Sequence, residues 1–151
     1  MGSRFAVLIA GLAVALAVAG VATAGNGGRP LSTTMTGANE APGPGDPNAT
    51  GEADVRLNQG QRRVCFDVSW ADVDGVVFAG HIHIAPVGVP GPIVVPLFTG
   101  SFAGTDATSG CVQDVDPGLI KAIRKHPSAY YVNVHSDPAF TGGALRGQLS
   151  K

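Results

Sequence analysis

The sequence lacks the features that mark most enzymes and nucleic-acid-binding proteins. Only 14% of its 151 residues are charged, and ten lysines and arginines stand against eleven acidic residues. This balance provides no basic surplus for nucleic acid. Neither a Gly-x-Ser-x-Gly element nor a phosphate-binding loop occurs in the sequence. We therefore predict no nucleic-acid partner and assign no catalytic residue.

Long apolar runs are absent after the first 21 residues, but one begins the chain. Arg4 precedes an unbroken apolar run over residues 5–21, and Ala22-Thr23-Ala24 follows it. This pattern predicts a secretory signal peptide over residues 1–24, cleaved after about Ala24, and hence a secreted protein with no membrane span after its removal. A retained N-terminal anchor is the alternative. We expect residues 25–30 to be a flexible leader and residues 31–150 to be one domain.

Cysteine is also scarce, with only Cys65 and Cys111 present. An even cysteine count in an exported chain predicts a disulfide between them. The two residues are 46 positions apart in the sequence, and closing a loop of that length stabilises a fold by about 4 kcal/mol in the chain-entropy model. A pair of metal-binding thiolates stays open as the alternative, although no Cys-x-x-Cys spacing supports it.

Alternation of apolar and polar residues dominates the rest of the chain and predicts strands. In residues 62–70 the side chains at even positions, from Val64 to Trp70, share one apolar face. One helix is expected at about 117–125, because Asp116 and Pro117 suit a helix start. We predict an all-β, antiparallel Greek-key sandwich or barrel of immunoglobulin-like or superoxide-dismutase-like type. The expected strands cover residues 31–36, 52–57, 62–70, 76–85, 92–98, 129–136 and 143–150, with an eighth starting at Cys111.

The strand phases place several polar side chains on one non-core side. Residues with core-facing phase are Phe78, Ile82, Ile84, Tyr130, Val132, Val134, Leu145 and Leu149. The opposite phase holds His81, His83, Tyr131, Asn133, His135, Ala144, Arg146 and Gln148. If these strands are neighbours, three imidazoles converge.

Three converging imidazoles are a ligand set for Cu or Zn. His81, His83 and His135 are the candidate metal ligands, and Arg146 and Asn133 are candidates for an outer shell or an anion contact. A structural network, in which the histidines hydrogen-bond loop backbone, is the competing interpretation. His126 lies outside this set, at the expected helix end.

Five segments in their order and spacing resemble the CHRD domain, first noticed in chordin and common in bacteria as a single secreted module. They are LSTTMTGANEAP, ATGEADVRLN, VCFDVSW, AGHIHIAPVGVPGPIVVPLF and YYVNVHSDPAFTGGALRGQL. The resemblance implies an immunoglobulin-like or superoxide-dismutase-like β-barrel, while the biochemical role of the family is largely undefined. The growth-factor-binding modules that accompany this domain in chordin have no counterpart here.

A more distant similarity is to copper/zinc superoxide dismutase, where a His-x-His strand and a later histidine bind copper and an arginine guides the anion. The matching positions are His81, His83, His135 and Arg146, but the metal-bridging histidine and the zinc loop have no counterpart. We expect a secreted, non-enzymatic module that binds a transition metal at the histidine cluster. A copper-dependent, dismutase-like redox enzyme and a structural or adhesive module without a ligand remain alternatives, and an extracellular protein or cell-surface component is the expected class of partner.

Overall fold

A computed structural model describes residues 29–151, and the predicted signal peptide lies outside them. The described chain forms eight strands, one α-helix and two short 3-10 helices, η1 (Gly37–Asn39) and η2 (Pro127–Ala129). The strands are β1 (Arg29–Thr36), β2 (Thr50–Asn58), β3 (Arg63–Ala71), β4 (Val76–Ile84), β5 (Ile93–Thr99), β6 (Ala107–Val112), β7 (Tyr130–Asp137) and β8 (Phe140–Gln148). The helix α1 spans Pro117–Lys125, as the sequence predicts.

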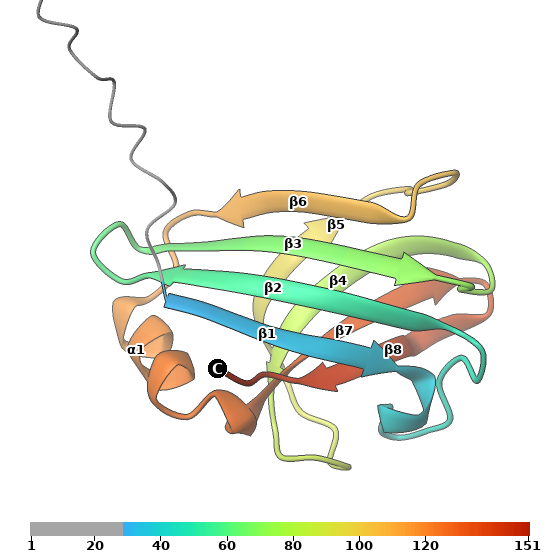
Figure 1. Ribbon diagram of the computed structural model, residues 1–151, viewed down its shortest axis with the longest axis horizontal. Coiled ribbons are helices and arrows are strands. Elements are labelled where there is room, and N and C mark those ends of the chain that lie inside the picture. Colours follow the sequence, from blue (N-terminus) through green and yellow to red (C-terminus); the bar gives the residue numbers. More distant parts are fainter. Residues whose placement is uncertain (1–28) are drawn as a thin grey trace, which may run out of the picture.

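The strands form one antiparallel sheet in the order β5-β4-β7-β8-β1-β2-β3-β6. The sheet curls until its two end strands, β5 and β6, approach each other, which gives a nearly closed barrel (Figure 1). The predicted all-β barrel with one short helix is therefore confirmed. Strand β5 lies at an end of the sheet, the position that its proline, Pro96, favours.

The core fills the inside of the barrel with the side chains that the period-two pattern selects. All four predicted residues of β3 are at most 6% exposed, including Trp70. The rings of Phe66, Trp70, Phe98 and Phe102 contact one another there. Gly80 makes room for this cluster, because a Cβ atom at its position would lie 2.4 Å from the Phe98 ring.

Two expectations about strand phase are wrong in β4. Phe78 is only partly buried and contacts the ring of His135, so it lies on the polar side. The register with β7 shifts between Val77 and Ala79, and this bulge makes Val77 the core residue in place of Phe78. Ile84 is 40% exposed, because the strand ends there and the chain leaves the barrel.

The boundaries of two other segments also differ from the expectation. Strand β6 begins at Ala107, so Cys111 lies near its end and not at its start. Its first four residues are small or polar, so their composition is typical of a loop and did not predict a strand. They nevertheless pair with β3. Strand β1 begins at Arg29, within the segment expected to be a flexible leader.

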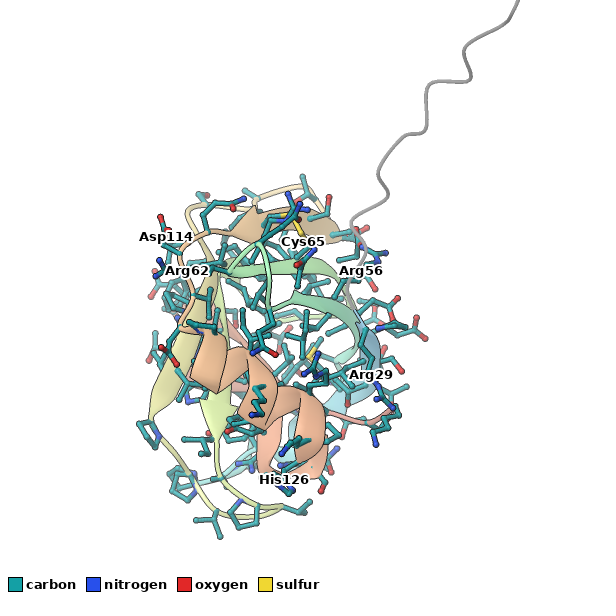
Figure 2. All side chains as sticks on the ribbon, turned by 90° about the vertical axis from the view of Figure 1, so that its left-hand side faces the viewer. Arg29, Arg56, Arg62, Cys65, Asp114 and His126 are labelled. Atoms are coloured by element: carbon teal, nitrogen blue, oxygen red, sulfur yellow. A yellow bond between two sulfur atoms is a disulfide. The ribbon has the colours of Figure 1, made fainter. Side chains whose placement is uncertain are left out.

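Cys65 and Cys111 form the predicted disulfide. They are directly paired across β3 and β6, with Cα atoms 3.9 Å apart, so the bond ties the end strand β6 to its neighbour (Figure 2). Helix α1 packs Ile120 and Ile123 into the core, and the side chain of Asp116 caps its first turn by accepting a hydrogen bond from the Leu119 N–H at 2.7 Å. In residues 29–151 no helix has the length and apolar character needed to cross a membrane.

Candidate metal centre

The strand order brings the predicted polar residues onto adjacent strands. Strand β7 lies between β4 and β8, with His81 opposite Asn133 and Asn133 opposite Arg146. His135 lies opposite Ala79, two residues before His81. The three histidines therefore share the non-core face of β4 and β7, as the strand phases predict.

The imidazoles of His81, His83 and His135 form a compact cluster. One nitrogen from each lies within 4.8 Å of the others, and His81 Nδ1 is 3.2 Å from His135 Nε2. An ion with metal–nitrogen distances of about 2 Å holds tetrahedral ligand atoms about 3.3 Å apart. The His81–His135 separation already has this value, and small side-chain movements bring in the third nitrogen.

Backbone carbonyls fix the outer nitrogen of two of these rings. His83 Nδ1 lies 2.8 Å from the carbonyl oxygen of Gly91, and His135 Nδ1 lies 2.9 Å from that of Thr141. A carbonyl oxygen only accepts hydrogen bonds, so each Nδ1 carries the proton and donates. Each Nε2 is then unprotonated and presents its lone pair to the cluster, His135 Nε2 toward Nδ1 of His81 and His83 Nε2 toward Oδ1 of Asn133. Metal-binding histidines are usually oriented by their surroundings in this way.

The cluster disfavours protonation. Burial and the neighbouring imidazoles of His135 and His83 lower the pKa of His81 to about 4. Burial likewise lowers the pKa of His135. Both rings are therefore neutral at physiological pH, which is the form that binds a metal ion.

Arg146 does not face solvent, although its phase points away from the core. Its side chain is 1% exposed, and its guanidinium donates hydrogen bonds to the carbonyls of Pro86 at 2.8 Å and Val89 at 3.0 Å. The guanidinium carbon also lies 3.5 Å from the ring centre of Tyr131, and that ring stacks on His83. Arg146 thus fastens residues 85–92, which we call the covering loop, over the polar face.

The covering loop has further attachments to the same face. Gln148 donates to the Ala85 carbonyl at 2.7 Å, and the Gly91 N–H donates to the Tyr131 hydroxyl at 3.2 Å. As a result His83 is 8% and Asn133 is 3% exposed, while His81 and His135 remain partly accessible. Figure 1 shows this loop between β4 and β5, below the barrel.

The segment between β1 and β2 adds a buried acidic residue that is not among the predicted site residues. Glu40 is 9% exposed, and burial raises its pKa to about 7. Its carboxyl group fills the space beside Gly143, where a Cβ atom would clash with it. Isolated acids in Gly- and Pro-rich loops have no periodic pattern, so only the resemblance to a family motif pointed to this position.

Asp46 organises this same segment and was missed by sequence reasoning. It is fully buried, and its carboxylate accepts hydrogen bonds from the N–H groups of Asn48, Ala49 and Asp74. These bonds tie the segment to the turn before β4. An Asx turn signal at Asp46-Pro47-Asn48 was the only local indication of this role.

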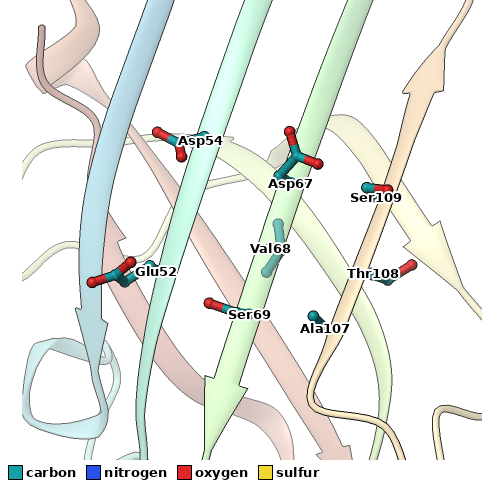
Figure 3. Close-up of a pocket in the computed structure, with 8 residues that line it drawn as sticks. All are labelled: Glu52, Asp54, Asp67, Val68, Ser69, Ala107, Thr108 and Ser109. Carbon is teal, nitrogen blue, oxygen red and sulfur yellow. The ribbon is translucent and has the colours of Figure 1, made fainter.

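A shallow hollow on the opposite side of the barrel contains no histidine. It is lined by residues of β2, β3 and β6, among them Glu52, Asp54 and Asp67 (Figure 3). Asp54 and Asp67 are direct cross-strand neighbours, and Arg56 forms an exposed ion pair with Asp67 at 2.7 Å. We interpret this surface as an ordinary solvated face.

Comparison with known proteins adds one result. No curated protein and no solved structure matches the chain. The sequence pattern of the CHRD domain matches residues 31–149. This range includes the eight strands of the described structure, except for the first two residues of β1. The histidine cluster, Glu40 and the disulfide all lie within the matched range, and the chain belongs to the CHRD domain family.

Proposed function

We propose that this chain is a secreted, non-enzymatic CHRD module, of the single-domain type common in bacteria, that binds one transition-metal ion through His81, His83 and His135. The observation that carries this proposal is the fixed orientation of two imidazoles. The carbonyls of Gly91 and Thr141 accept the Nδ1 protons, so both Nε2 atoms are unprotonated and their lone pairs point into the cluster. Cu and Zn are the ions that such a nitrogen set prefers.

A secreted location agrees with the disulfide and with the family. Disulfides persist in oxidising compartments, and Cys65–Cys111 closes the end strand of the barrel. The extracellular partner of this module, whether a protein or a cell-surface component, is part of the proposal and has no assigned surface.

A dismutase-like reaction has less support than metal binding alone. In that enzyme an arginine guides the anion to copper, and Arg146 is the matching residue here. Its guanidinium is buried and donates to two carbonyls of the covering loop. These bonds indicate that Arg146 stabilises the loop. Its charge is not exposed and therefore cannot attract an anion.

The test is the affinity of the purified protein for Cu²⁺ and Zn²⁺, measured by competition with a chromogenic chelator. We expect one ion per chain with micromolar or tighter affinity, and loss of this binding in a His81→Ala/His83→Ala double variant. His126→Ala provides a matched control, because His126 is exposed at the end of α1 (Figure 2) and is not a member of the cluster.

Two results would contradict metal binding at this site. The first is the absence of binding at micromolar metal in the wild-type protein. The second is an equal loss of affinity in the His126→Ala variant, which would indicate nonspecific binding to surface imidazoles. A structural network of histidines predicts instead that the double variant loses thermal stability to the same extent with and without a chelator.

A further inference from the structure

We propose that the side-chain oxygen of Asn133 is a fourth ligand of this metal ion and that Glu40 positions it. The inference rests on the proposed metal-binding function and adds a residue to the same site. It makes the centre a four-coordinate set of three imidazole nitrogens and one amide oxygen.

The first support is the place of Asn133 within the cluster. It lies on β7 directly opposite His81 and is 3% exposed. Its Oδ1 is 3.0 Å from Nε2 of His83. Two atoms that bind one ion at about 2 Å are separated by about this distance, so Oδ1 needs little movement to become a ligand.

The second support is an unfavourable contact that a cation removes. His83 Nδ1 donates its proton to the Gly91 carbonyl, so Nε2 of the neutral ring presents a lone pair. Oδ1 of Asn133 presents another lone pair to the same Nε2 atom. Two acceptors facing each other in a buried site repel, since neither supplies a hydrogen. A metal ion between them would be bound by both.

The third support is the orientation of the Asn133 amide. The Asn133 amide acts to lower the pKa of Glu40, against the larger effect of burial, which is the influence of an NH₂ group near a carboxylate. Oε1 of Glu40 is buried and has no partner at hydrogen-bonding distance within residues 29–151. With the NH₂ group drawn toward Glu40, the amide oxygen faces the histidines, as the outer partner of a metal ligand requires. The reversed amide would place its oxygen against Glu40, which is favourable only when that carboxyl group is protonated.

The ligand set has consequences for the ion. An amide oxygen is a hard ligand, and together with three imidazoles it favours Zn²⁺ or Cu²⁺ over Cu⁺. Four protein ligands also fill a tetrahedral ion and leave no open position for a substrate, which is typical of structural centres. This agrees with a non-enzymatic module.

The deciding experiment is pulsed electron paramagnetic resonance of the Cu²⁺-loaded protein in water enriched in ¹⁷O. We expect no strongly coupled, equatorial water in the wild-type protein, because Oδ1 of Asn133 occupies that position. An Asn133→Leu variant, which has similar size but no oxygen, should show this water and bind Zn²⁺ about 10- to 100-fold more weakly. A Glu40→Leu variant should show the same water signal, because the amide is then free to turn.

The wild-type spectrum decides the matter even if a variant does not fold. Copper bound with an equatorial water overturns the role of Asn133 while metal binding itself stands, whereas a wild-type protein that binds no ion removes both proposals. Unchanged Zn²⁺ affinity in a folded Asn133→Leu protein also overturns the fourth ligand. An unchanged spectrum in Glu40→Leu shows that Glu40 does not position the amide.

Discussion

Replacing Glu40 with glutamine should stabilise the metal-free protein by an amount that grows as pH rises from about 4.5 to about 7. In the folded protein, burial raises the pKa of Glu40 from 4.5 to about 7. Between these values the folded chain holds a proton that the unfolded chain has released. The wild-type protein therefore loses stability across this window, and the glutamine variant, which has no proton to lose there, avoids that loss.

The size of the effect follows from the same two values. Each pKa unit corresponds to about 1.4 kcal/mol, so a rise from 4.5 to about 7 corresponds to about 3 kcal/mol when the carboxyl group is fully ionised. Movement of the exposed part of the loop and entry of water reduce this value. We expect the variant to gain on the order of 1–3 kcal/mol relative to wild type between pH 4.5 and pH 8.

The assay is urea unfolding with a chelator present, followed by the fluorescence of Trp70, the single tryptophan, which is 6% exposed. His81 has the opposite effect, because its folded pKa of about 4 lies below the ordinary 6.5 and stability therefore rises with pH between these values. The His81 contribution is common to both proteins and cancels in their difference.

The exposed Glu52→Gln variant controls for the loss of a surface carboxylate. A difference that is equal at pH 4.5 and pH 8, or that shrinks with rising pH, would refute this reasoning.

Three further predictions concern the scaffold. Replacing Cys65 and Cys111 together with alanine should lower the free energy of unfolding by about 2–4 kcal/mol, and an unchanged urea midpoint would contradict a restraint on β6. Gly80→Ala should cost about 1–3 kcal/mol, since its Cβ atom would lie 2.4 Å from the Phe98 ring; wild-type stability in calorimetry would show that the ring yields freely. Arg146→Leu should lower stability by about 2–4 kcal/mol and speed hydrogen exchange in the covering loop, because two loop carbonyls lose their charged donor; slow exchange there would mean that other contacts suffice.

The strands and their core-facing residues were predictable from sequence, because the alternation of apolar and polar residues shows which side chains of a strand share a face. His81 and His83 are two residues apart, and a strand sends such residues to the same face. The same rule selected His135 on β7. It failed at Phe78, because a bulge inserts one residue and reverses the phase without any marker in the sequence.

The surroundings of the cluster were not predictable in the same way. A non-core phase does not say whether a side chain is exposed, and Arg146 and Asn133 are almost fully buried beneath loops. Their partners come from distant segments, as in the bonds from Arg146 to the covering loop and the approach of Glu40 to Asn133. Irregular loops carry no period, so their path over the sheet depends on tertiary contacts that single residues do not reveal.

The metal content of the protein isolated from its native cells tests the central claim most directly. Elemental analysis should find about one equivalent of copper or zinc per chain, as three imidazoles on one face predict. The same analysis of a His81→Ala/His83→Ala protein should find none. Wild-type protein with no more metal than the double variant, and no uptake when Cu²⁺ or Zn²⁺ is supplied, would contradict a metal centre in this barrel.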